Sequence, residues 1–479
     1  MNRPVSRIDR LLEFGLIAVC TLAPLPFGSI APAGRLALEL TCFALLLVWW
    51  VAQRRRHSRS DGAAAAVVQP PLASRIALAA ILVITAIQII PLSHEWVAQI
   101  SPNAERIRTT VSANGNALEA EERLLDMSTQ RLDAAPTLSV EPGATATALR
   151  SGAALVALLL VSCHVAARVG VRRLMLALLI SAAFQALYGL TVLATGFDQI
   201  WHLSKSAYLD SATGTWINRN HFANYLAMAL PCGAALWAHR VQRAQHNSTR
   251  WFLQMFNSRG SRNLLLAGAL MLGLAGLALS FSRAGIAVGF LGVTLTLWLG
   301  FRNRPLAARG LLLSIIVMLA LVPLVQVGAD ALLNRFGRSA ENFSAPGNRA
   351  TVWGDTLQLS REFPLTGSGL GTFASVYPTV RSPNVRFYFA HAHNDLLQFA
   401  AEAGWVAALW MALILAQLIS RIAAAMRGRH GPLAVGLAIG LSAALLHALI
   451  DFSFHLPANA ATATILAGAL WGLPCAKRS

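Results

Sequence analysis

The sequence predicts an all-α, polytopic membrane protein with about twelve transmembrane helices, because its apolar runs approach the roughly 20 residues that cross a bilayer. Composition supports this prediction, since 56% of the 479 residues are hydrophobic and only 13% are charged. Soluble domains carry about 25% charged residues. The mean hydropathy of +0.55 points the same way.

The predicted spans follow the chain as apolar stretches bounded by polar or arginine-rich segments. They lie at about 11–30, 35–53, 74–93, 147–167, 174–195, 221–239, 263–281, 284–301, 309–328, 395–419, 433–452 and 458–474. The first run follows Arg3, Arg7 and Arg10 and superficially resembles a signal peptide. Because so many spans come after it, we expect an uncleaved first helix.

Arginine supplies most of the positive charge, and its placement sets the predicted orientation. The formal net charge is +18, and short loops such as 54–56, 168–173 and 421–429 carry much of it. This pattern follows the positive-inside rule, so both termini are predicted to be cytoplasmic. The loops at about 94–146 and 329–394 are then outside. Charge confined to such loops argues against a nucleic-acid-binding surface.

Three regions follow from this topology. Residues 1–195 form an N-terminal set of helices, 196–420 hold most of the polar clusters, and 421–479 form a C-terminal hairpin. The cysteines have neither paired nor metal-ligand spacing, which indicates no disulfide framework and no zinc site. They are Cys20, Cys42, Cys163, Cys232 and Cys475. Neither HExxH nor CxxC occurs, so we predict no metal and no cofactor.

Four polar clusters fall on the predicted outer side of the membrane, at 218–221, 282–283, 391–395 and 451–455. Arg219 and Arg283 stand at helix ends, where two guanidinium groups can bind a phosphate in bidentate fashion. A pyrophosphate is the anion that a lipid presents at this depth. The alternative is that each arginine merely extends its side chain to the interface.

The motif His391-Ala392-His393-Asn394-Asp395 opens the tenth predicted span. His393 is a candidate general base, because imidazole titrates near neutral pH. Asp395, Gln398 and Glu402 share one helical face and can orient that base or bind hydroxyl groups. The alternative is a helix cap at Asn394 or Asp395 above a buried polar stripe. Asp451 and His455 are either supporting partners or an interfacial turn.

The order of NRNHFANYL, SFSRAG, Arg349 with Trp353, PLTGSGLGTF and HAHNDLLQFAAEAG resembles the O-antigen ligase and polymerase superfamily over about residues 210–420. The resemblance implies an all-helical GT-C-type fold with a long periplasmic loop, here at about 329–394. It implies that His393 is catalytic and that Arg219 and Arg283 hold the donor diphosphate. The remaining candidates for support or acceptor binding are Asn220, His391, Asn394, Asp395, Gln398, Glu402 and Arg349.

The resemblance also implies a metal-independent, inverting glycosyltransferase of the bacterial inner membrane, acting on its periplasmic side. The donor would be a glycan on undecaprenyl diphosphate, and chain-length or assembly proteins are candidate partners. The acceptor would be lipid A–core for a ligase, a second lipid-linked glycan for a polymerase, or a protein hydroxyl. The spacing from His393-Asn394 to Gly404 favours the ligase, while Ala407 departs from that signature and keeps the polymerase open.

A twelve-span secondary transporter is the alternative from another functional class. Transporters place their substrate groups near the bilayer midplane, often between two related halves. The polar clusters of this sequence instead gather at one face, and its halves show no clear similarity. The sequence therefore favours the enzyme.

Overall fold

The computed structural model describes residues 5–59, 69–111, 135–244, 258–302, 348–427 and 431–474. Its N-terminal elements are α1 (Arg7–Leu22), η1 (Phe27–Ser29), α2 (Pro32–Arg59), α3 (Leu72–Gln88), α4 (His94–Ile100), α6 (Pro142–Arg168) and α7 (Arg172–Thr195). The middle elements are β1 (Gln199–Ile200), β2 (Leu203–Ser204), α8 (Arg219–Ala244), α10 (Ser258–Ala278) and α11 (Arg283–Gly300). The last are α14 (Arg349–Glu362), α15 (Phe373–Val376), η2 (Tyr377–Thr379), α16 (Asp395–Met426), α17 (Pro432–Ala448), η3 (Ser453–His455) and α18 (Pro457–Gly472).

The protein is an all-α, polytopic membrane protein, and within the described residues its strands form only one short antiparallel pair, β1 with β2. Six described helices are long and apolar enough to cross a membrane: α2 over 32–55, α6, α7, α10 over 261–278, α11 and α16. The apolar helices α3 and α17 are shorter. The predicted span at 309–328 lies outside the described residues.

The first predicted span, 11–30, is wrong as a continuous helix. Helix α1 ends at Leu22, and the chain turns through η1 before α2 begins. Pro24 and Pro26 explain the stop, because proline lacks the N–H that a continuing helix needs. Gly28 then adopts φ 71°, a left-handed conformation that suits glycine. This turn brings the start of α2 to one end of the bundle.

Small residues let the central helices approach closely. Helix α18 packs along α6, and α17 packs along α8. A Cβ on Gly472 would collide with the carbonyl oxygen of Cys163, and one on Gly440 with that of Met228. Each lies in a Gly-x-x-x-Gly pattern, the spacing by which membrane helices bring their backbones together. These contacts fix the C-terminal hairpin against the N-terminal half.

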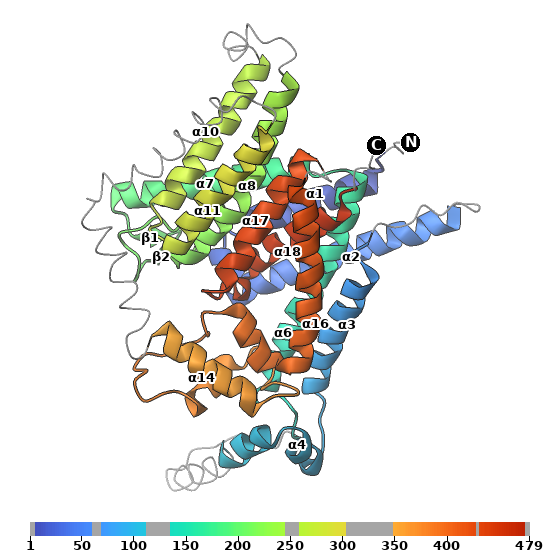
Figure 1. The fold of residues 1–479 in the computed structure, drawn as a ribbon, viewed down its shortest axis with the longest axis vertical. Helices are drawn as coiled ribbons and strands as arrows, with labels where there is room; N and C mark the ends of the chain where they lie inside the picture. Colours follow the sequence, from blue (N-terminus) through green and yellow to red (C-terminus); the bar gives the residue numbers. More distant parts are fainter. Residues whose placement is uncertain are drawn as a thin grey trace.

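Helix α16 is bent near its N-terminal end. Gly404 has φ 81° and ψ 165°, so residues 395–403 and 405–426 form two helical parts. The second part has a length of about 33 Å at about 1.5 Å per residue, sufficient to cross the hydrocarbon core. Helix α16 also packs against α14, and α14 and α4 lie at one end of the bundle (Figure 1). The predicted outer loops therefore contain helices where they are described.

Candidate active site

Three chain segments converge on the ring of Phe452, between α17 and α18. The imidazole of His391 stacks on this ring with centroids 4.5 Å apart. His393 and His221 meet it edge-on, at 4.8 Å and 4.7 Å. His221 comes from the first turn of α8, and the other two histidines precede α16. The structure thus joins three of the four predicted polar clusters.

His393 forms a pair with Asp451. Its Nδ1 lies 3.2 Å from Oδ1 of Asp451, whose side chain is only 2% exposed. His393 has φ 53°, an unusual backbone conformation for a residue with a side chain. Its own side chain remains 20% exposed. Because Nδ1 faces the carboxylate, Nε2 is the nitrogen that can meet a substrate.

The buried Asp451 carboxylate is held in its ionised form. Burial by itself opposes ionisation, but the hydrogen bond with His393 and nearby positive charges, including that of Arg349, keep its pKa below the usual range. Arg349 is fixed by a 2.7 Å hydrogen bond from Nη1 to the carbonyl oxygen of Ile450. An ionised carboxylate beside His393 can stabilise the imidazolium form.

A second histidine–aspartate pair lies next to the first. His455 Nδ1 is 2.7 Å from Oδ1 of Asp395, whose other oxygen accepts a 3.0 Å hydrogen bond from the N–H of Phe454. Burial lowers the pKa of His455, but the hydrogen bond to Asp395 and that carboxylate's charge outweigh it, and the pKa is raised. Asp395 therefore ties the start of α16 to η3.

Gln398 connects the His455–Asp395 pair with Ala392 and His391 of the histidine motif. Its Oε1 accepts a 2.9 Å hydrogen bond from the N–H of Ala392, and its Nε2 lies 3.2 Å from His391 Nδ1 and 3.0 Å from His455 Nε2. Burial, with the neighbouring histidines, lowers the pKa of His391 to about 3. His391 is thus a neutral ring, held by Gln398 and Phe452.

Asn394 caps α16. A cap at Asn394 or Asp395 was the alternative interpretation of the histidine motif. Asn394 Oδ1 accepts a 3.0 Å hydrogen bond from the N–H of Leu397. A cap satisfies a backbone donor that the first helical turn leaves free. This cap coexists with the histidine pairs, so the two interpretations of the motif are compatible.

Glu402 anchors the glycine-rich turn at 367–373. Its two carboxylate oxygens accept 2.9 Å hydrogen bonds from the N–H groups of Gly371 and Phe373. Gln398 donates a third, of 3.0 Å. Gln88 of α3 binds the same turn through the N–H of Leu370 and donates to the carbonyl oxygen of Glu402. The glycine-rich turn therefore rests on a buried polar support formed by Glu402, Gln398 and Gln88.

The two predicted phosphate-binding arginines lie at adjoining helix starts. Arg219 donates a 3.1 Å hydrogen bond to Ser211 Oγ, and its guanidinium lies 5.1 Å from the ring centre of Tyr208. Arg283 begins α11 directly after the capping residue Ser282. The first turn of α11 packs so closely on α8 that a Cβ on Gly285 would meet Ala223. The N–H of Asn220 bonds to the side chain of Asn218, which orders the start of α8.

Two contributors to the site were not singled out from the sequence. Phe452 looks like an ordinary interfacial aromatic residue, and its role depends on two remote segments, the start of α8 and the histidine motif. Gln88 had a weak signal, since a polar amide at the end of an apolar helix usually has a specific partner. Among the described residues, no group of three His, Cys, Asp or Glu side chains is arranged to hold a metal ion.

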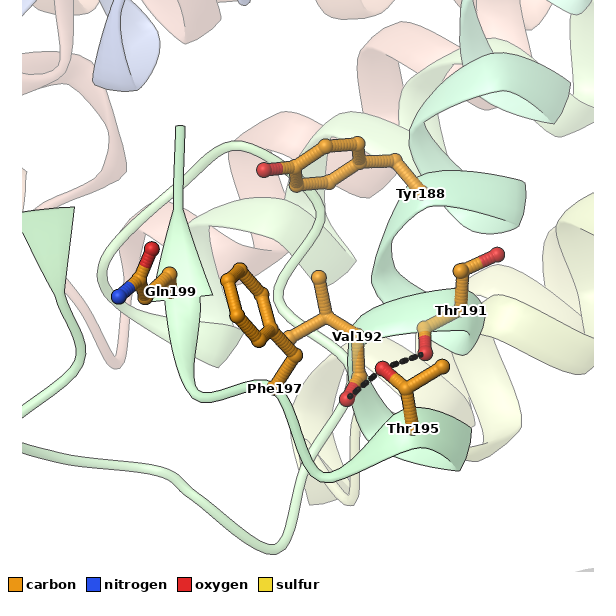
Figure 2. Close-up of a pocket in the computed structure, with 6 residues that line it drawn as sticks. All are labelled: Tyr188, Thr191, Val192, Thr195, Phe197 and Gln199. Atoms are coloured by element: carbon orange, nitrogen blue, oxygen red, sulfur yellow. Dashed lines mark hydrogen bonds between the residues drawn. The ribbon is translucent and has the colours of Figure 1, made fainter. Parts of the chain in front are cut away.

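A cavity of about 480 Å³ lies elsewhere, against the outer end of α7. Figure 2 shows the residues that line it: Tyr188, Thr191, Val192, Thr195, Phe197 and Gln199. Thr195 bonds back to the carbonyl oxygens of its own helix. The cavity lining contains no charged side chain, so it offers none of the groups gathered around Phe452.

Comparison with known proteins finds a similarity over the middle of the chain. No curated protein matches the chain. A family model described as O-Antigen ligase (Wzy_C) matches residues 268–412, a range that includes Arg283, Arg349 and the histidine motif. Residues 268–412 of this membrane protein therefore form an O-antigen ligase domain.

Proposed function

We propose that this protein transfers a glycan from undecaprenyl diphosphate to a sugar hydroxyl of an acceptor, with a ligase-type acceptor such as lipid A–core. The observation that supports this most strongly is the His393–Asp451 pair, at 3.2 Å, beside the helix starts that carry Arg219 and Arg283. A base and a diphosphate-binding group are the two requirements of such a transfer.

The reaction can be written with these groups. His393 Nε2 takes the proton of the acceptor hydroxyl as its oxygen attacks the anomeric carbon. The bond from that carbon to the diphosphate oxygen breaks, and the configuration inverts because the attack is direct. Arg219 and Arg283 stabilise the negative charge on the leaving undecaprenyl diphosphate, a preorganised electrostatic effect that is often the largest in catalysis. Asp451 stabilises the imidazolium form of His393.

The remaining polar residues support this arrangement. Asp395, Gln398 and His455 hold the chain on either side of His393, and Arg349 fixes the backbone before Asp451. Glu402 anchors the glycine-rich turn. We propose that the site faces the periplasm from the inner membrane and that both termini are cytoplasmic. The arginine-rich loops support this orientation.

Transfer by the purified full-length protein tests the proposal. Undecaprenyl-diphosphate glycan is the donor, and lipid A–core and a second lipid-linked glycan are offered separately. Product on lipid A–core indicates a ligase, whereas a ladder of longer lipid-linked chains indicates a polymerase. His393→Ala should lower kcat by about 10²–10⁴-fold, the usual contribution of a general base.

Two further variants make the test specific. Asp451→Asn should lower kcat by at least about tenfold, because it removes the charge that orients and stabilises the base. His94→Ala is the matched control, since the His94 side chain is 69% exposed on α4. If His393→Ala transfers glycan as fast as wild type, His393 is not the base. If no acceptor is modified by any protein, the transporter alternative gains support.

A further inference from the structure

Among the described residues, no partner of the Arg35 side chain occurs. Arg35 lies in the first turn of α2, about five helical turns from the arginine-rich end of the same helix at 54–56. Its side chain is partly buried, and its Nε atom is buried without a hydrogen-bond partner. Burying a guanidinium donor without a partner is costly, so such a group usually serves a ligand.

The carboxylate that could neutralise Arg35 is already occupied. Glu39 lies one helical turn along α2, the spacing at which a helical ion pair forms. Its side chain is 4% exposed, and its oxygens instead accept hydrogen bonds from Arg150 and Ser151 of α6. Among the described residues, the Arg35 side chain consequently has neither an ion pair nor a hydrogen bond.

Helix α2 contacts η1, η1 packs on α18, and α18 also contacts η3, which carries His455. The start of α2 therefore lies near one end of a row of rings. His221, Phe452, His391 and His455 follow one another with centroid distances of 4.7, 4.5 and 4.4 Å. The positive charge of Arg35 reaches His455, where it partly offsets the effect of Asp395 on the pKa. Arg219, two residues before His221, belongs to the opposite end of the row. His393 contacts the middle, at Phe452.

We propose that Arg35 binds a phosphate group of the acceptor lipid. The acceptor is then held at the His455 end of the row, while the donor diphosphate lies at the Arg219 end. This inference rests on the proposed function for the assignment of donor and acceptor. A guanidinium suits the task, because its planar fork can donate two hydrogen bonds to one phosphate. Phosphorylated lipid A–core and a second undecaprenyl-diphosphate-linked glycan both supply this group.

Steady-state kinetics with the two substrates varied separately tests the site. Arg35→Gln should raise the KM for the acceptor by about tenfold to a hundredfold, the value of a charge-assisted hydrogen bond, with donor KM and kcat nearly unchanged. Arg35→Lys should recover part of the loss, because it keeps the charge but not the fork. Arg106→Gln is the control, since the Arg106 side chain is 65% exposed and lies 3.9 Å from its partner Glu362.

Equilibrium binding separates this proposal from the proposed reaction. Phosphorylated lipid A–core, undecaprenyl diphosphate and phosphatidylglycerol are titrated against full-length protein in the His393→Ala background, with and without Arg35→Gln. Weaker binding of lipid A–core identifies a ligase-type acceptor, and weaker binding of undecaprenyl diphosphate with unchanged donor KM identifies a polymerase-type acceptor. Weaker binding of lipid A–core supports the site even if no glycan is transferred, whereas the polymerase-type outcome also uses the donor KM of the active protein.

Other results would overturn the proposal that Arg35 binds the acceptor phosphate. An Arg35→Gln variant that binds both phosphorylated lipids like wild type excludes the site. An equal loss for phosphatidylglycerol shows that Arg35 only contacts bulk lipid headgroups. A rise in donor KM alone places Arg35 with the donor and also rejects the proposal. If Arg35→Gln fails to fold, an Arg35→Lys variant whose acceptor KM is unchanged also excludes the site.

Discussion

His393 and His455 are both paired with a buried aspartate, yet their second nitrogens differ. His455 Nε2 lies 3.0 Å from Gln398, so both of its nitrogens have protein partners. His393 bonds through Nδ1, and no partner of its Nε2 occurs among the described residues. A histidine with both nitrogens occupied holds structure together, whereas one with a free nitrogen can exchange a proton with a substrate.

The pairing of His455 with Asp395 predicts a pH-dependent stability. The folded-state pKa of His455 is raised above the ordinary value of a histidine, so the stability that its protonated form contributes is complete below that ordinary value. The contribution is lost as pH rises through the folded-state pKa. His455→Gln should therefore lower the Tm most under acidic conditions, and the difference from wild type should shrink as pH rises. Thermal melts of both proteins between about pH 5.5 and about pH 9 measure this.

His202→Gln serves as the control for this experiment, because His202 is exposed in the β1–β2 hairpin. The Tm difference between this control and wild type should vary little with pH. A His455→Gln difference that grows with rising pH would have the wrong sign for a raised pKa. That result would show that Asp395 does not favour the protonated form of His455.

At the scale of elements, the length of the apolar runs predicted helices such as α7 and α11, but it did not predict where a helix bends. The predicted spans at 174–195 and 284–301 correspond to α7, Arg172–Thr195, and α11, Arg283–Gly300. Their ends are marked by arginine, glycine or a capping serine. The bend in α16 had no comparable signal, because a single glycine is tolerated within an apolar helix. It depends on residues 365–367, which approach Gly404 only in the folded chain.

Gly404→Ala should disrupt the junction between α16 and the outer loop. A Cβ at this position would collide with the carbonyl oxygen of Leu365 and lie 2.7 Å from the N of Gly367, and φ is 81°. Together these effects should cost about 2 kcal/mol or more of stability. Amide hydrogen exchange at Gly371 and Phe373, which Glu402 holds, should accelerate. Thermal melts and exchange measurements on the same protein test both expectations.

Gly354→Ala is the matched control for this change. Gly354 lies within α14, and a Cβ there would meet no atom within 4 Å. Alanine is favoured over glycine in a helix by roughly 1 kcal/mol, so this variant should be neutral or slightly more stable. If both variants behave alike, the backbone at Gly404 is not under the constraint that its geometry indicates.

At the scale of the whole molecule, the sequence indicated the polar clusters but not how their residues pair. The histidine motif and Asp451 were both assigned to the outer side, but they are 58 residues apart in sequence. Their pairing requires the α17–α18 hairpin to pack against the outer part of α16. Arg35 was overlooked for the same reason, since its proximity to His455 depends on the turn that ends α1 at Leu22.

The orientation of the molecule is the last and broadest expectation, and single cysteines can measure it. Four native cysteines are buried, so after Cys475→Ser they should not react with a membrane-impermeant maleimide. Phe387→Cys should be labelled in intact spheroplasts, because Phe387 is 75% exposed just before the histidine motif. Arg55→Cys, exposed at the inner end of α2, should be labelled only after the membrane is opened. The opposite pattern would place His393 on the cytoplasmic side, out of reach of a glycan presented in the periplasm, and would refute the proposed transfer reaction.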